Sequence, residues 1–400
     1  MLETGLLELA KGIGRLFMNP LLYWIILLFI AVSYKRIKKE RLQFGTKIFP
    51  ILTEAKYTIG LSLLGSFIIS VLSITLGIVF TIDIAVILMV VIVVFTLTAS
   101  TSFLSSSYTI GITFIVALLL PFTDLIQTQS EMMQPAYYFG LSLVLAILLL
   151  IEALLLLSKR APSYPELIKS ERGVWIGQHH LKRMAFIPFF CLFPSSMFTM
   201  ELPLLPYVDI GNESYMIVLF PFVIGYHYKV LAELPQQAAK KIGKSVLFLS
   251  IIVLCLAFIS IYYPAVSMVA VACAILGKEW IMFAHSSKNM NKMSVLHPMN
   301  DGLKVLTTIP DSPAERLGIL IGETIVKVNG RAINETNQFY EALQNSGAFF
   351  KLEVLDTNGE VRFINSALYD TDHHELGIVF VGEPYHMKAE SKTESKAESS

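Results

Sequence analysis

From Tyr57 to Leu157 the sequence contains 101 consecutive residues without a single lysine or arginine. Soluble domains carry about 25 % charged residues, so a stretch this long and this poor in positive charge cannot be a solvated surface. The whole chain of 400 residues agrees, because 54 % of it is hydrophobic, only 16 % is charged and its mean hydropathy is +0.62. Most of the chain is therefore predicted to lie in lipid.

Apolar runs of helical length fill the first 284 residues. A helix needs about 20 apolar residues to cross the roughly 30 Å hydrocarbon layer. Nine runs qualify, and counts of seven or eight stay open because the stretch from Ser245 to Gly277 is too long for one crossing and short for two. The runs are 16–34, 57–80, 82–100, 108–126, 136–157, 184–200, 214–231, 245–263 and 265–284. An α-helical polytopic membrane domain of seven to nine helices is predicted over residues 1–284.

Basic residues indicate the orientation of these spans, since short cytoplasmic loops carry the positive excess. The loops around 123–135 and 201–214 contain acidic residues but no lysine or arginine. With nine spans, every basic loop falls on one side, which predicts an outside N-terminus and a cytoplasmic C-terminal region. The basic residues of these loops are Lys35, Arg36, Lys38, Lys39, Arg41 and Lys47, then Lys159, Arg160, Lys169, Arg172, Lys182 and Arg183, then Lys229, Lys240, Lys241 and Lys244.

Ionisable residues inside the spans are functional candidates, because a charge in lipid is costly. They are Asp83, Asp124, Glu152, His227 and Glu279. Each is expected to reach an interface or a partner, which leaves a transporter as a minor alternative. The basic loop 158–183, with its tryptophan and tyrosine, is expected to lie along the lipid headgroups. A protein-docking role for this loop is the alternative.

From His285 onward the pattern changes to short alternating apolar runs separated by turn residues, as in a small sheet with helices. Strands are expected at 303–309, 323–328, 349–355, 360–365 and 376–381, and helices at 312–317 and 334–345. Residues 305–330, VLTTIPDSPAERLGILIGETIVKVNG, resemble the core of a bacterial PDZ domain, with SPA, two glycines, G-E-x-I and Asn329-Gly330 in the order typical of that family. The expected organisation is a linker at 285–296, a β-rich (α+β) PDZ-like domain at 297–383 and a disordered tail at 384–400.

PDZ domains bind an extended peptide at a sheet edge beside a helix. The resemblance implies that this edge is Glu375, Leu376, Gly377, Ile378 and Phe380, placed at the end of the domain as in permuted bacterial PDZ domains. Backbone N–H groups around Leu376 to Ile378 would receive a carboxylate or an internal turn. The facing helix would supply Phe339, Tyr340 and Leu343 as specificity residues. The alternative is a closing strand that binds no ligand.

Catalytic and cofactor motifs are missing from the sequence. His373-His374-Glu375 is not the H-E-x-x-H of metalloproteases, and no P-loop or dinucleotide fingerprint is present. The three cysteines lie in apolar runs without metal-ligand spacing. No basic domain typical of nucleic-acid binding is present either. We therefore expect no enzyme, no cofactor, no metal site and no nucleic-acid partner.

A multi-span body followed by one PDZ domain and no catalytic motif resembles the MinJ family, the polytopic topological determinants of cell division in Bacillus-like bacteria. This resemblance implies a membrane scaffold at the septum and poles that bridges DivIVA to MinD, and through MinD to the inhibitor MinC. Membrane lipid is the other expected contact, and homo-oligomerisation is left open. The alternative from a different class is a membrane peptidase or secretion component whose PDZ domain presents substrates.

Overall fold

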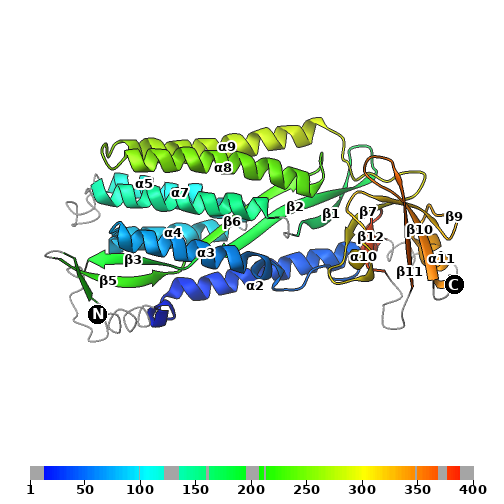
Figure 1. The fold of residues 1–400 in the computed structure, drawn as a ribbon, viewed down its shortest axis with the longest axis horizontal. Helices are drawn as coiled ribbons and strands as arrows, with labels where there is room; N and C mark the ends of the chain where they lie inside the picture. Colours follow the sequence, from blue (N-terminus) through cyan, green and yellow to red (C-terminus); the bar gives the residue numbers. More distant parts are fainter. Residues whose placement is uncertain are drawn as a thin grey trace.

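The computed structural model describes residues 13–98, 100–120, 135–158, 162–194, 207–210, 213–346, 349–367 and 376–387. Five of its helices are long and apolar enough to cross a membrane: α2 (Pro20–Phe44), α3 (Thr53–Thr75), α7 (Pro135–Leu157), α8 (Pro235–Ile259) and α9 (Val266–Asn291). Two shorter apolar helices, α4 (Ile82–Leu97) and α5 (Ser106–Leu119), form a hairpin through the 3-10 helix η1 (Thr101–Leu104). The chain is thus a helical membrane protein with a β-rich C-terminal region (Figure 1).

Helix ends coincide with local stop and start signals. The side chains of Asn19 and Thr81 accept hydrogen bonds from backbone N–H groups in the first turns of α2 and α4, as expected of N-caps. Helix α2 ends at Gly45, whose φ of 75° is left-handed, the usual way for a helix to end. The Thr81 cap begins α4 directly after the break that separates it from α3.

Two of the nine expected helical spans are wrong. Residues 184–200 and 214–231 are, where described, strands: β2 (Trp175–Phe186), β3 (Phe189–Pro194), β5 (Glu213–Phe220) and β6 (Val223–Val230). β2 pairs with β6 and β3 pairs with β5, both antiparallel. We call these four strands the ribbon. Ile187 N–H donates to Phe222 O (2.8 Å) where the two halves meet, so the ribbon continues past Pro188 and Pro221.

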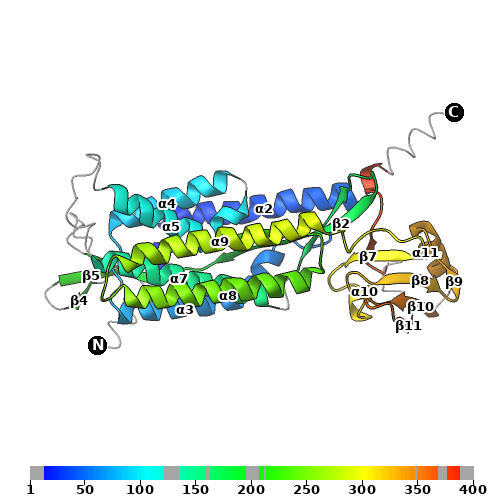
Figure 2. The same cartoon turned by 90° about the horizontal axis from the view of Figure 1, so that it is seen from above.

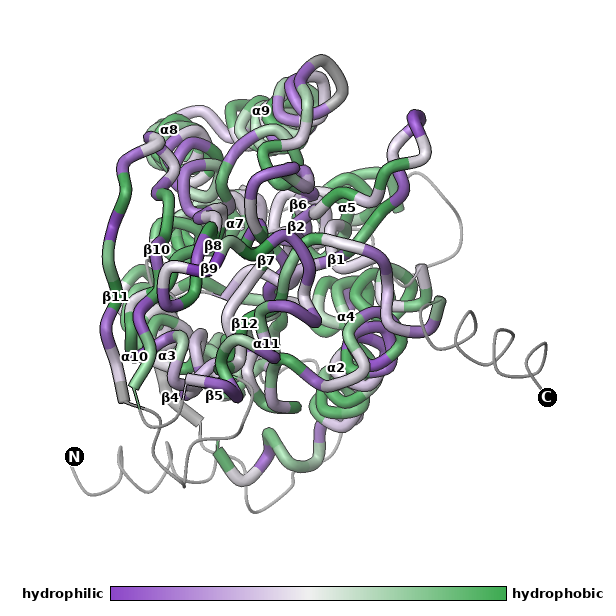
Figure 3. Tube along the Cα trace, turned by 90° about the vertical axis from the view of Figure 1, so that its right-hand side faces the viewer, coloured by the Kyte–Doolittle hydropathy of each residue, from purple (hydrophilic) through white to green (hydrophobic). Residues whose placement is uncertain are grey.

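The ribbon runs diagonally through the helical bundle (Figure 1), and the end-on view shows β2 and β6 near its centre, among α3, α4, α5 and α7 (Figure 3). Met184, Phe189, Cys191 and Phe222 are each 0 % exposed. Non-helical backbone at membrane depth must be buried in protein, because lipid offers no hydrogen-bond partners. A ribbon enclosed by helices meets that requirement.

Hydroxyl side chains of helix α3 form hydrogen bonds with backbone groups on the ribbon's outer edge. Thr58, Ser62, Ser66, Ser70 and Ser73 are buried along one face of this otherwise apolar helix. The Thr58 hydroxyl donates to Met184 O (3.3 Å), and the Ser70 hydroxyl accepts from Phe190 N–H (2.9 Å). Small polar side chains allow close approach in membranes and offer hydrogen bonds there. The spacing of about four residues places them on one helix face.

The basic loop expected along the lipid headgroups is, over its described part, built from β-strands. β1 (Tyr164–Lys169) and the first half of β2 form a hairpin, paired from Tyr164↔His180 to Lys169↔Trp175. This hairpin projects from the bundle toward the C-terminal domain (Figures 1 and 2). It is an extension of the ribbon, which makes it a contact surface between the two regions.

The C-terminal region forms the expected small sheet with two helices. Its strands are β7 (Leu303–Thr308), β8 (Thr324–Val328), β9 (Arg331–Ala332), β10 (Phe349–Leu355), β11 (Val361–Ala367) and β12 (Ile378–Phe380), and its helices are α10 (Pro313–Arg316) and α11 (Thr336–Gln344). The strand order is β11-β10-β8-β7-β12, with β9 beside β8. Asn329 and Gly330 have φ of 49° and 81°, as a type I′ hairpin turn requires. Of the expected disordered tail at 384–400, residues 385–387 form a helical turn in which His386 bonds Leu42 O (3.0 Å), and residues 388–400 lie outside the described residues.

A candidate peptide-binding groove on the PDZ domain

The candidate groove is formed by strand β12 and helix α11. The Phe339 ring of α11 packs edge-on against Phe380 of β12, with centroids 5.1 Å apart, and Tyr340 packs edge-on against Phe339 at 5.4 Å. These aromatic contacts fix the spacing between the strand and the helix. The structure therefore brings together the two elements that the PDZ resemblance pairs.

Most of the expected specificity side chains lie in the domain core. Leu343, Leu376, Ile378 and Phe380 are between 1 and 8 % exposed and Phe339 is 0 % exposed, so they form the floor between strand and helix. Tyr340 is half-buried against the same cluster. Glu375 lies outside the described residues. A ligand would thus meet the backbone of β12 and the flank of α11 more than these buried side chains.

Backbone groups on the outer edge of β12 are oriented for strand addition. Ile309 N–H donates to Gly377 O (2.8 Å) and Val381 N–H donates to Lys304 O (2.9 Å). Since successive residues of a strand alternate in direction, the N–H and C=O groups of Ile378 and Phe380 face away from β7. Among the described strands, β12 pairs only with β7. This is the arrangement that an added peptide strand needs.

Gly377 shapes the start of that edge. Its φ is 78°, and a Cβ at this position would lie 2.5 Å from the Cβ of Ser312. Only glycine fits both the conformation and the space. The close approach allows Ala314 N–H to donate to Leu376 O (2.9 Å), which fixes the turn ahead of the strand against α10.

The PDZ domain is also docked onto the membrane region, which the sequence reasoning missed. Gly177 N–H donates to Leu296 O (2.7 Å), and His179 Nε2 donates to Leu306 O (3.0 Å) on β7. An apolar cluster surrounds these bonds and joins both regions: Leu167, Leu296, Leu306 and Val381, with Phe44, Trp175, Ile321 and Val379 packed against them. The β1–β2 hairpin thus holds one face of the PDZ sheet.

Two titratable groups of this hairpin have strongly shifted pKa values. Burial lowers the pKa of His179 to about 4, although its bond to Leu306 opposes the shift. Burial acts to raise the pKa of Glu166, but hydrogen bonds from His180 and Lys39 prevail and lower it to about 2. At neutral pH the docking contact therefore contains a neutral histidine and an ionised carboxylate.

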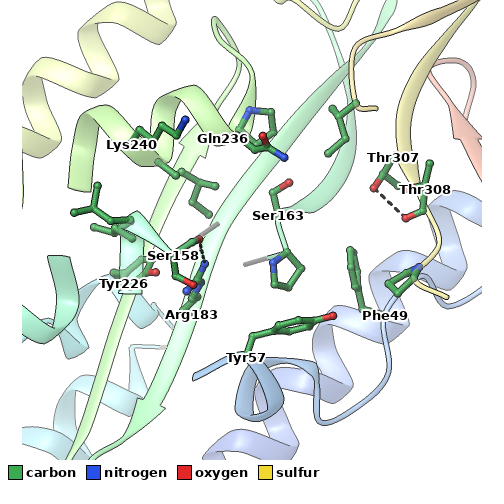
Figure 4. A pocket seen from close by; sticks show the side chains of 18 of the residues that line it. Phe49, Tyr57, Ser158, Ser163, Arg183, Tyr226, Gln236, Lys240, Thr307 and Thr308 are labelled. Carbon is green, nitrogen blue, oxygen red and sulfur yellow. Dashed lines mark hydrogen bonds between the residues drawn. The ribbon is translucent and has the colours of Figure 1, made fainter. Parts of the chain in front are cut away.

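A cavity of about 690 Å³ lies beside the docking contact. Figure 4 shows Thr307 and Thr308 of the PDZ domain on the side opposite Lys240 of α8, with Arg183 of the ribbon between them and Tyr226. The PDZ domain is therefore held through the β1–β2 hairpin, and this cavity lies between its residues Thr307 and Thr308 and the first turns of α8. Both described groove elements remain outside it.

Three of the ionisable residues expected inside the spans, Glu152, His227 and Glu279, have side-chain partners in the structure. Glu152, 0 % exposed, forms an ion pair with Lys278 and accepts a hydrogen bond from Ser105 (2.6 Å). The Tyr108 hydroxyl donates to Glu279 (2.7 Å), and His227 lies 2.7 Å from His180. Asp124 lies outside the described residues. Among the residues that the structure describes, no three His, Cys, Asp or Glu side chains are grouped as metal ligands would be.

Comparison with known proteins identifies the family to which the chain is similar. A model described as PDZ domain matches residues 304–354. The cell division topological determinant MinJ of Bacillus subtilis (strain 168) is 31 % identical over 383 residues, which cover 94 % of this chain and 95 % of that protein. The probable cell division topological determinant MinJ of Lacticaseibacillus paracasei is 25 % identical over 84 residues, 21 % of this chain and 23 % of that protein.

A protease match is confined to a short segment. Mouse serine protease HTRA3 is 37 % identical over 65 residues, 16 % of this chain and 14 % of the protease. The relative matched along nearly its whole length is a division determinant and not a known enzyme. Since that match includes the membrane region as well as the PDZ domain, the chain belongs to the family of the cell division topological determinant MinJ.

Proposed function

We propose that this protein is a non-enzymatic membrane scaffold that positions the division-inhibitor system at the septum and cell poles. In this proposal it bridges DivIVA to MinD and, through MinD, to MinC. Full-length similarity to a division topological determinant carries the proposal. The outer edge of β12, which pairs with no second described strand and lies beside α11, would supply a docking site of the kind that a scaffold requires.

Confinement to the membrane would strengthen weak docking. A bundle of apolar helices restricts the attached PDZ domain to the membrane plane, which raises the effective concentration of partners held at the same surface. Residues of β12 and α11 do not line the cavity at the bundle, although Val379 of β12 packs against Phe44 and Phe49 of the membrane region. The proposed groove is therefore separate from this cavity while the domain is fixed.

We place the PDZ end in the cytoplasm. Lys35, Arg36, Lys38, Lys39 and Arg41 lie in the C-terminal half of α2, which reaches the PDZ end of the molecule (Figure 2). Lys182 and Arg183 of β2 and Lys240, Lys241 and Lys244 of α8 lie toward the same end. This distribution supports the orientation through the positive-inside tendency of short loops.

A membrane peptidase or secretion component that presents substrates is the second candidate. Only the short PDZ match to HTRA3 favours it. Proteolysis of a membrane-protein substrate by the purified full-length chain would favour this candidate over the scaffold.

The test is fluorescence imaging of a fusion in growing rod-shaped bacteria that lack their own copy. The full chain is compared with a chain ending at Pro298, a cut that keeps α9 and the Leu296 contact to the hairpin intact. We expect the full chain to be enriched at septa and poles. The localisation of the truncated chain shows whether the PDZ domain or the membrane region directs the protein there. Even distribution of the full chain around the membrane contradicts the proposal.

The groove itself is tested by Tyr340→Glu, which places a charge on the flank of α11. Gln344→Glu, on an exposed position of the same helix, is the matched control. The scaffold proposal expects at least a fivefold loss of MinD or DivIVA co-purification with Tyr340→Glu and less than a twofold loss with the control. Equal recovery of both partners with both variants contradicts a role for the groove.

A further inference from the structure

A recess of about 1260 Å³ lies where the membrane region meets the β1–β2 hairpin. Its walls come from the end of β6, the last turns of α9, the 292–298 linker, the β1–β2 hairpin and the Ser100–Ser102 turn between α4 and α5. It is separate from the cavity beside the PDZ domain and from the groove at β12. Neither the family match nor the proposed scaffold role assigns it a ligand.

The recess owes its position to the short α4–α5 hairpin. At 1.5 Å per residue, the 16 residues of α4 span about 24 Å and the 14 of α5 about 21 Å, less than the roughly 30 Å hydrocarbon layer. The 26 residues of α9 span about 39 Å by the same rule. Figure 2 shows α4 ending well before α2 and α9 reach the PDZ end. A gap is thereby left at membrane-boundary depth.

The lining combines positive charge with apolar surface. The lining contains four cationic residues and one acidic residue. The cations are Lys169, Arg172, Lys229 and Lys292, and the acid is Glu171. All four cationic side chains are exposed, and within the described part of the chain none lies within 4.0 Å of a carboxylate oxygen. Ile168, Ile176, Leu231 and Met282 supply apolar surface beside them. Basic pockets at membrane boundaries recognise anionic head groups.

We propose that this recess binds the phosphodiester head group of an anionic phospholipid. The four cations would surround the phosphate, and the acyl chains would lie in the gap beyond the η1 turn. The membrane-boundary position favours a lipid over a soluble anion, because the apolar lining and the short hairpin offer space for acyl chains. Bound lipid would then tie the β1–β2 hairpin to α9.

The walls of the recess are already fixed relative to one another. Asn289 of α9 donates to Lys229 O (2.6 Å) and accepts from Leu231 N–H (3.3 Å) at the end of β6. His285 of α9 donates to Lys229 O (2.9 Å). Ser102 donates to His227 O (3.1 Å). A ligand would therefore meet a preformed site, which lowers the entropic cost of binding.

The experiment is native mass spectrometry of the full-length chain in neutral detergent with added phosphatidylglycerol or phosphatidylcholine of the same acyl chains. We expect phosphatidylglycerol to bind at least tenfold more tightly. A variant with Lys169→Gln, Arg172→Gln, Lys229→Gln and Lys292→Gln should lose at least tenfold, since each basic residue near a membrane surface contributes roughly fivefold. The matched control, Lys35→Gln, Lys38→Gln, Arg41→Gln and Lys47→Gln, removes four exposed bases near the same end and should change binding less than twofold.

A second variant separates the recess from general surface charge. Ser286→Trp fills the recess from an exposed position of α9 and keeps all four cations, so it should also abolish tight binding. Equal binding of both lipids, equal loss in the two fourfold variants, or unchanged binding by Ser286→Trp would overturn the proposal. Competition by glycerol 3-phosphate at concentrations similar to the lipid would assign the recess to a soluble phosphate and overturn it as well.

Discussion

The ribbon and the PDZ sheet are both antiparallel, but they protect their backbone in different ways. The PDZ sheet buries one face, and β10 alternates exposed and buried residues from Phe349 to Leu352. Its outer strands, β11 and β12, have edges that pair with no other described strand. The ribbon is enclosed by helices, and hydroxyls of α3 and η1 bond its outer edges.

This difference follows from the solvent. Water can satisfy an open edge of the PDZ sheet, so that edge is free to accept a peptide. Lipid cannot form hydrogen bonds with a strand edge, so each backbone N–H and C=O group of the ribbon needs a partner within the protein. Open edges therefore suit the region that we propose for docking, and closed edges suit the region that anchors it.

The largest effect is expected from the ion pair beside the ribbon. Lys278, 1 % exposed, pairs with Glu152 and lies 5.3 Å from the Tyr228 ring of β6. Lys278→Ala leaves a buried carboxylate without its cation, which costs about 3–5 kcal/mol. The free energy of unfolding of the full chain in detergent measures this loss of stability. Glu152→Met with Lys278→Met should restore most of the loss, and a single-variant loss below about 1 kcal/mol contradicts a structural role.

A substitution in the PDZ core should destabilise the PDZ domain and leave the ribbon unchanged. Leu352 is 0 % exposed between β8 and β11, so Leu352→Ala is expected to cost about 2–5 kcal/mol. Hydrogen exchange should then increase across β7 to β12 and stay slow in the ribbon. Phe349→Ala, on the same strand and 74 % exposed, is the control with little effect. Equal deprotection of β2 and β6 would mean that both regions unfold as one unit.

Removal of a single hydroxyl of α3 should leave one backbone N–H of the ribbon edge without its hydrogen-bond acceptor. Ser70→Val removes the acceptor of the Phe190 N–H and leaves a buried donor without a partner, at a cost of about 1–3 kcal/mol. Thr75→Val on the same helix is the control, because the Thr75 hydroxyl is exposed and bonds only within α3. Unfolding midpoints of the two variants give the comparison. Similar midpoints would show that α3 does not support the ribbon edge.

The smallest effect concerns pH at the contact between the regions. The pKa of His179 is lowered from 6.5 to about 4 by burial, so the unfolded chain binds more protons between these values and stability falls as pH falls from 6.5 to 4. Lowering the pH from 7.5 to 6.0 should cost about 1 kcal/mol through this group. His179→Gln keeps a donor for Leu306 O and should remove that part of the pH dependence. An unchanged pH dependence contradicts the assignment.

The same contrast explains which elements could be predicted from sequence. In the PDZ domain, alternating apolar residues and the Asn329-Gly330 turn led to the right strands. The ribbon is buried on both faces, so its apolar runs lack alternation and cannot be told from helices by period. Pro188, Pro194 and Pro221 inside those runs were the available signal, since proline interrupts a helix. The four-residue spacing of Ser and Thr in α3 was another.

The described residues named for the groove lie together in the structure, whereas Glu375 lies outside the described part, and their exposure could not be read from the sequence. Phe339 and Leu343 repeat at helical spacing, which indicates a buried face but not whether a ligand reaches it. The docking of the PDZ domain through Gly177 and His179 depends on a hairpin that was expected to be a headgroup loop. Contacts between distant segments of this kind leave no local pattern.

Site-specific photo-crosslinking in growing cells tests the central claim, that the groove at β12 and α11 docks a division partner, most directly. A benzophenone amino acid replaces Tyr340 in the full-length chain, and the exposed position Gln344 carries it in the control. The account predicts an adduct containing DivIVA or MinD at position 340, with at least fivefold less at position 344. An equal yield at both positions, or no adduct with either partner at position 340, would contradict it.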